Sequence, residues 1–166
     1  MKTTLKIDPM INRLLGMKMK DARGYVGWFE ESKYDDNTKI GDVAFWQEYG
    51  TKRGIPQRPF MRPAKLHNEQ KWNMLIAQEV RKCIEKALPL TLALQRVGLV
   101  VAGDIQNEIR SVYEPPLKES TVKARLRRHK GKPFIMSATK PLVDTGILLG
   151  SLGTDSNYKP VRVEEV

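Results

Sequence analysis

The side chains of this sequence that most often carry catalysis or bind metals are few: two histidines, His67 and His129, and one cysteine, Cys83. Neither histidine has a cysteine or a second histidine at the spacing of zinc ligands, and no motif pairs either with a nucleophile to activate. Cys83 cannot form an internal disulfide and stands at an apolar position of a helical pattern, which predicts a buried thiol in a reducing cytoplasm. We therefore expect neither a metal nor a cofactor.

Two groups of acidic residues have the composition for acid–base or metal chemistry, and each has a plainer interpretation. Asp104 and Glu108 lie four residues apart on one helix face, where solvent-facing charge is favoured over a catalytic pair. The run Asp35-Asp36-Asn37 lacks the alternating ligands and the later glutamate of a calcium loop, so a solvated turn is favoured. No phosphate loop, dinucleotide fingerprint or Gly-x-Ser-x-Gly motif occurs either. An enzyme is therefore not expected, and a nuclease ranks last among the functions considered.

The net charge of +10 is concentrated in one stretch, since residues 114–140 carry eight basic and two acidic side chains. Cations at this density contact phosphates, contact an acidic protein or lie in a solvated loop, and all three alternatives stay open. Phe134 is the only aromatic residue between Tyr113 and Tyr158, so stacking platforms for single-stranded bases are scarce. The candidate contacts to nucleic acid or to an acidic partner are Lys123, Arg125, Arg127, Arg128, Lys130 and Lys132.

Two long amphipathic helices are the main elements that the sequence predicts. Apolar residues recur at helical spacing between Trp72 and Leu88, and Pro63 suits the first turn of that helix. A second stripe runs from Leu94 to Val112, between Pro89 and the pair Pro115-Pro116. At about 1.5 Å per residue each helix reaches roughly 30 to 40 Å. The longest apolar stretch, residues 97–102, is far shorter than the roughly 20 residues that span a membrane, so a soluble, unexported protein is expected.

Shorter elements surround the two helices. Asp8 followed by Pro9 predicts a short N-terminal helix, residues 25–29 and 158–163 have strand composition, and residues 121–126 form a helical turn. Asp42 is placed to cap a helix over residues 43–49 that ends at Gly50, and Asp144 to cap a helix over residues 147–149. These elements predict one α+β domain over residues 1–166. Its small antiparallel sheet packs against the two long helices, with long extended loops and a basic loop at about residues 115–140.

Two segments rich in proline, glycine and aromatic residues prescribe backbone shape and contact surface rather than chemistry. The first contains Glu48-Tyr49-Gly50-Thr51 and, after a short gap, Ile55-Pro56-x-Arg58-Pro59-Phe60-Met61-Arg62-Pro63-Ala64; the second is Pro141-Leu142-Val143-Asp144-Thr145-Gly146-x-Leu148 with Ser151. With a strand around Gly27 before them and two helices between them, their order resembles the tail-completion or neck proteins of tailed bacteriophages, including the virion-morphogenesis family. The resemblance covers roughly residues 20–155.

This resemblance implies a structural virion protein that completes the head-proximal end of a phage tail and joins it to the head connector. It implies a homo-oligomeric ring, in which six copies would match the symmetry of a tail tube. The expected partners are a head connector or stopper protein and a tail terminator or tail-tube protein, with DNA possible in the lumen and no membrane. The expected location is the virion neck, after assembly in the host cytoplasm. The basic stretch of residues 126–139 has no counterpart in the family pattern.

A ring needs buried aromatic anchors with arginine among them, beside a loop that proline stiffens. The expected interface residues are Phe45, Trp46, Tyr49, Arg58, Pro59, Phe60, Arg62, Asp144, Thr145 and Gly146. The alternative for the aromatic residues is that they cover the core of their own chain, because such side chains have much apolar area to bury. The second hypothesis for the whole protein is a basic DNA-binding accessory protein.

Overall fold

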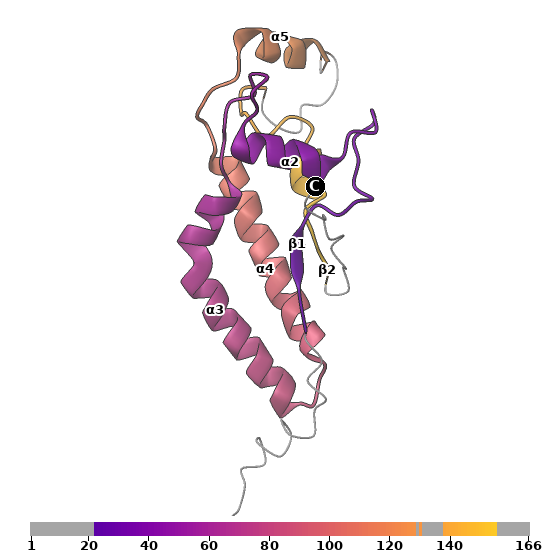
Figure 1. Cartoon of the computed structure of the whole chain (residues 1–166), viewed down its shortest axis with the longest axis vertical. Helices are drawn as coiled ribbons and strands as arrows, with labels where there is room; N and C mark the ends of the chain where they lie inside the picture. The colour runs from indigo at the N-terminus through magenta and orange to yellow at the C-terminus, as the bar shows by residue number, and fades with distance from the viewer. Residues whose placement is uncertain (1–21, 129, 131–137, 156–166) are drawn as a thin grey trace, which may run out of the picture.

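Two long antiparallel helices form the axis of the molecule, and the short elements gather along one helix and at one end (Figure 1). The computed structural model describes residues 22–128, 130 and 138–155. The elements are β1 (Tyr25–Gly27), α2 (Ile40–Tyr49), α3 (Met61–Glu85), α4 (Leu90–Ser111), α5 (Glu119–Arg128), α6 (Ile147–Gly150) and β2 (Gly153–Asp155). None of the helices in these described ranges is long and apolar enough to cross a membrane.

The long helices α3 and α4 confirm the two predicted from hydrophobic periodicity. Pro63 lies in the first turn of α3, where its missing N–H would have had no partner within the helix. The hairpin turn uses Ala87 at a φ of 52°, with the Leu88 N–H donating to the carbonyl of Cys83. Pro89 then precedes α4 and prevents the first helix from continuing.

The sheet has two short antiparallel strands, with Tyr25 opposite Asp155 and Gly27 opposite Gly153. It lies against α4, whose other side packs on α3. Gly98 of α4 permits this approach, because a Cβ there would overlap the hydroxyl of Thr154 and lie 3.0 Å from its Cβ. The combination of helices with a small antiparallel sheet is thus confirmed, although the sheet packs mainly on α4 rather than on both long helices.

The main core lies at the end of the molecule where α2, the start of α3, the last turns of α4 and residues 142–152 meet; we call this the core end. Its buried members are Ile40, Ala44, Phe60, Ala64, Ala102, Ile105, Ile109, Leu142, Val143, Leu148, Leu149 and Leu152. Cys83, Ile84, Ala93 and Val97 are buried apart from this cluster, toward the hairpin turn. The predicted burial of the Cys83 thiol is confirmed.

Several local predictions need correction. Helix α2 begins at Ile40, so Asp42 lies within its first turn and does not cap it, whereas Gly50 does end it with a positive φ of 71°. Residues 119–128 form the complete helix α5, where the sequence predicted one turn within a basic loop. The strand that pairs with β1 is β2, which the sequence did not predict. The expected N-terminal helix and the expected strand at residues 158–163 lie outside the described residues.

Candidate functional site

Three aromatic side chains of α2 reach the surface, and we call them the aromatic patch: Phe45, Trp46 and Tyr49. Phe45 is 59% exposed and Tyr49 54%, and their ring centroids lie 4.8 Å apart. The guanidinium of Arg62, at the start of α3, lies 5.1 Å from the centroid of the Tyr49 ring, within the range of a cation–π contact. The patch is therefore continuous with the beginning of α3.

The position of this patch relative to α3 is set by Glu48, which is 3% exposed and points from α2 to the start of α3. One carboxylate oxygen accepts from the N–H groups of Phe60 (2.6 Å) and Met61 (2.9 Å), and the other from the N–H (3.2 Å) and Nε (2.9 Å) of Arg62. Helix α3 has no side-chain cap at its own N-cap residue, Phe60. Glu48 therefore supplies from another helix the acceptors that the free N–H groups need.

Arg58 and Phe60 face the core of their own chain, which corrects their expected role as interface residues and agrees with the alternative that such residues cover their own core. Phe60 is fully buried and meets Trp28 edge to face, with centroids 5.8 Å apart. Arg58 donates to the carbonyls of Pro115 (2.7 Å) and Pro116 (3.1 Å) and to the side-chain oxygen of Gln47 (3.1 Å). Burial lowers the pKa of the Arg58 guanidinium, and the charge of Arg125 adds to this effect. Pro59, between them, is partly buried.

Two cations of the basic segment bind the turn that precedes α6. Arg125, whose side chain is 11% exposed, donates to the carbonyls of Lys140 (2.7 Å) and Pro141 (3.0 Å) and lies 3.5 Å from the carboxylate of Asp144. Arg128 donates to the same carboxylate at 2.8 Å. These two arginines attach α5 to the turn that follows it, so they are not free cations awaiting a partner.

Asp144 therefore accepts from α5 instead of capping α6. Gly146 holds the N-cap position of α6 with a φ of 84°, a left-handed conformation that favours glycine, and no side chain caps it. The hydroxyl of Thr145 accepts from the Ile147 N–H at 3.4 Å. The Asp-Thr-Gly motif thus shapes a turn held by α5, and its expected contact with another subunit stays a prediction.

The outward cations are Lys123, Arg127 and Lys130, all exposed, with Lys123 paired to Glu119 at 2.6 Å along the same helix. Exposed pairs of this kind contribute less than about 1 kcal/mol. Lys132 lies outside the described residues. Arg128 is also on the surface, with its side chain 60% exposed, although it is paired with Asp144, whereas Arg125 is the one largely buried among the predicted contact residues that the structure describes.

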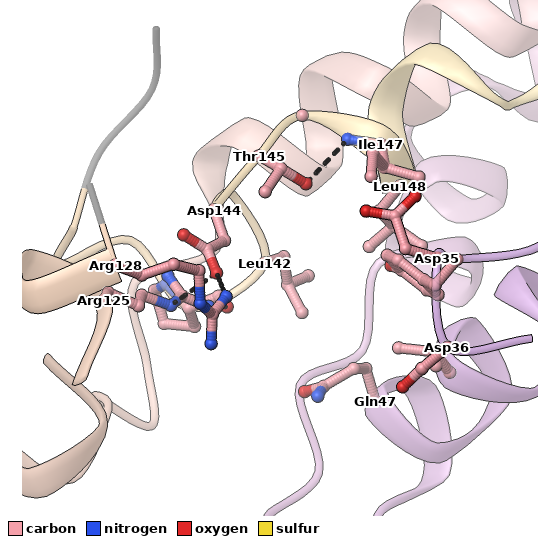
Figure 2. Close-up of a pocket in the computed structure, with 14 residues that line it drawn as sticks. Asp35, Asp36, Gln47, Arg125, Arg128, Leu142, Asp144, Thr145, Ile147 and Leu148 are labelled. Carbon is pink, nitrogen blue, oxygen red and sulfur yellow. Dashed lines mark hydrogen bonds and ion pairs between the residues drawn. The ribbon is translucent and has the colours of Figure 1, made fainter. Parts of the chain in front are cut away.

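A pocket of about 460 Å³ lies between α2, α5 and the turn that precedes α6. Figure 2 shows Arg125, Arg128 and Asp144 on one side of it and Asp35, Asp36 and Gln47 on the other. Apolar side chains also line it: Val43, Leu142, Ile147 and Leu148. Tyr34 belongs to the lining as well, and burial, followed by the negative charges of Asp144 and Asp36, raises the pKa of its hydroxyl. The pocket has the composition of a receptor for an apolar side chain flanked by charges.

The carboxylates of Asp104 and Glu108 contact side chains of α3. Asp104 accepts from Lys71 Nζ (2.7 Å) and Trp72 Nε1 (2.8 Å), and Glu108 lies 3.4 Å from His67 Nδ1. These contacts join α4 to α3, which corrects the expectation that both carboxylates face only water. Among the described residues there is no group of three or more His, Cys, Asp or Glu side chains that could hold a metal ion.

No protein-family model, no curated protein and no solved structure matches this chain. The contact that sequence reasoning missed is Glu48. A signal was present, because the predicted start of α3 contains no Ser, Thr, Asp or Asn to satisfy its N–H groups.

Proposed function

We propose that this chain is a structural, non-enzymatic virion protein of a tailed bacteriophage, assembled as a ring that completes the head-proximal end of the tail and joins it to the head connector. The resemblance of the two loop segments to tail-completion proteins motivates the proposal. The observation that carries it here is the aromatic patch, whose three large side chains stay exposed on α2 while Phe60 nearby is fully buried and Trp28 packs against it, partly buried. Exposed aromatic residues gathered on one face mark contact surfaces.

The hydrogen bonds that hold the aromatic patch in place support the same proposal. Glu48 and Arg58 fix α2 and the loop of residues 50–60 against the start of α3 and the prolines after α4. A surface that is already rigid loses little entropy when it docks, which favours assembly of many copies. Six copies, the neck of the virion and assembly in the host cytoplasm all belong to this proposal.

The test mixes the purified full chain with the tail-tube and head-connector proteins of the same genome and images the products by negative-stain electron microscopy. We expect rings at the head-proximal end of the tail tube. The double variant Phe45→Ala/Tyr49→Ala should abolish them, whereas Tyr113→Ala, which removes a ring exposed to a similar extent elsewhere on the surface, should not. A chain that stays monomeric both alone and with these proteins would remove the proposal.

The alternative of a DNA-binding accessory protein has less support from the contacts. Arg125 and Arg128 were two of its six cations, and both are engaged by carbonyls or by Asp144. A band shift that weakens steeply with salt and disappears when Arg127 and Lys130 are neutralised would favour it over the ring.

A further inference from the structure

The two faces of helix α5 differ in what their side chains contact. One face carries Arg125 and Arg128, which bind the turn before α6, although the Arg128 side chain is still 60% exposed. The outward face of α5 carries Lys123, Leu126 and Lys130 at spacings of three and four residues, so the three side chains form one row, which we call the docking stripe. Lys130 lies just beyond the helix, and its N–H still donates to the carbonyl of Arg127 at 3.3 Å.

The docking stripe is apolar at its centre and positive at both ends. Leu126 is 53% exposed, and α5 buries none of its residues in the monomer. A helix that attaches by two arginines and leaves its leucine outside has an unused contact face. Helices with such a face commonly lay it into an apolar groove of another protein.

The pocket beside α2 has the complementary composition. Its apolar lining includes Leu142 and Leu148, and the carboxylates of Asp35 and Asp36 stand across it from Arg128 (Figure 2). Asp144 is already paired with Arg125 and Arg128. Among the described residues, neither Asp35 nor Asp36 forms an ion pair with a basic side chain. These two carboxylates, which form one wall of the pocket, can therefore pair with a cation of another molecule.

We propose that the docking stripe of one copy inserts into this pocket of a second copy, with Leu126 over the apolar lining and Lys123 and Lys130 beside Asp35 and Asp36. The stripe and the pocket lie on different surfaces of the chain, so the contact is head to tail, and repetition generates a ring when the rotation closes. This contact specifies how neighbouring copies of the proposed ring would bind each other, and the closure of the ring rests on the proposed function.

A second copy fits the stripe better than DNA does. A duplex would place phosphates against Leu126, and the few outward cations would neutralise few of them. The pocket instead offers an apolar surface for the leucine and carboxylates for the lysines. Charges arranged in this way set the partner and the register of a contact.

The test uses charge reversal in the full chain and sedimentation velocity over a range of concentrations. One variant reverses the stripe, Lys123→Glu/Lys130→Glu, and the other reverses the pocket wall, Asp35→Lys/Asp36→Lys. Each variant alone brings like charges together, so we expect its self-association to weaken by about tenfold or more. An equimolar mixture of the two should recover most of the association, because each reversed surface then meets an opposite charge. Recovery also shows that both variants are folded.

A matched control reverses two exposed cations far from the stripe in sequence, Lys52→Glu/Arg53→Glu, with the same change in net charge. It should associate like the unmodified chain and should not rescue the pocket variant. The inference is overturned if the mixture stays as weak as its parts, or if the unmodified chain shows no self-association. It is also overturned if the stripe variant loses DNA binding but keeps its self-association.

The two proposals fail in distinguishable ways. Rescue by mixing without rings on the tail-tube or connector proteins would leave this contact standing and remove the proposed function. If the charge-reversal variants form rings as well as the unmodified chain does, the proposed function stands and the proposed contact is wrong.

Discussion

A single buried carboxylate, Glu48, connects the surface expected to dock with the start of the longest helix. Four donors converge on it, three of them backbone N–H groups at the beginning of α3. Burial alone raises the pKa of this carboxyl, but the hydrogen bonds from Phe60, Arg62 and Met61 outweigh it and hold the pKa below its ordinary value of 4.5. The ionised form is therefore the form that stabilises the fold.

The charge of Glu48 should contribute to stability in a defined pH window. Its folded pKa is lowered, so its contribution is fully present above pH 4.5 and is lost as the pH falls through the lower folded value. We expect Glu48→Gln to lower the free energy of unfolding at pH 7 by about 2 to 4 kcal/mol. Urea denaturation should show this difference shrinking below pH 4.5.

The control for this prediction is Glu69→Gln, on the exposed side of α3, where the ion pair with Lys65 is open to solvent. Its effect should stay within about 0.5 kcal/mol at every pH. A Glu48→Gln difference that did not change with pH would show that shape rather than charge determines the contribution of this residue.

The sequence singled out Phe45, Tyr49, Arg58 and Phe60 together and left open whether they faced a neighbour or their own core. The structure divides them: the first two are exposed and the last two are buried. Composition and spacing could not make this division, because an aromatic residue suits both environments. The decision depends on contacts distant in sequence, such as Arg58 with Pro115 and Pro116.

At the scale of elements, periodicity predicted α3 and α4, because a stripe of apolar residues is a local property of the chain. The cap assignment of Asp42 failed because α2 begins earlier, at Ile40, and that of Asp144 failed because its carboxylate pairs with arginines of α5. Asp144 binds arginines 16 and 19 positions earlier in the chain, a distance that no local pattern reveals. Strand β2, Gly-Thr-Asp, contains two residue types that are depleted in strands, and it forms where Gly98 of α4 leaves room for Thr154.

The approach of β2 to α4 predicts opposite effects for two glycines of the same helix. Gly98→Ala should destabilise the protein by about 1 to 3 kcal/mol, because its Cβ would overlap Thr154. Gly103→Ala should stabilise it by about 0.5 to 1 kcal/mol, because no atom lies within 4 Å of the added Cβ and alanine favours helix. Thermal denaturation measures both changes.

Removing the neighbour provides the decisive control for this contact. In a Thr154→Gly background, the penalty of Gly98→Ala should largely disappear, since both clashing atoms are absent. An equal penalty in both backgrounds would mean that α4 itself, rather than its contact with β2, rejects the alanine.

At the scale of the whole molecule, burial is unevenly distributed. The main cluster lies at the core end, and a smaller set around Cys83 and Ile84 lies toward the hairpin turn. Between Ala64 and Cys83, helix α3 has no buried residue, and Leu66 is 77% exposed. The amphipathic stripe predicted over this stretch is only partly covered by α4, since Trp72, Leu75 and Val80 are half-buried, and a pattern does not state how completely a neighbour covers it.

This distribution predicts that equivalent truncations at the two ends have different consequences. Ile109→Ala removes a fully buried side chain from the main cluster and should lower the global free energy of unfolding by about 2 to 5 kcal/mol. Ile84→Ala acts outside that cluster, so it should mainly promote local opening of the hairpin end. Hydrogen exchange should then speed up at residues 80–96 in Ile84→Ala and throughout the described helices in Ile109→Ala. Uniform acceleration in both variants would show instead that the two buried sets unfold as one cooperative unit, and that the long hairpin is held as firmly at its turn as at the core end.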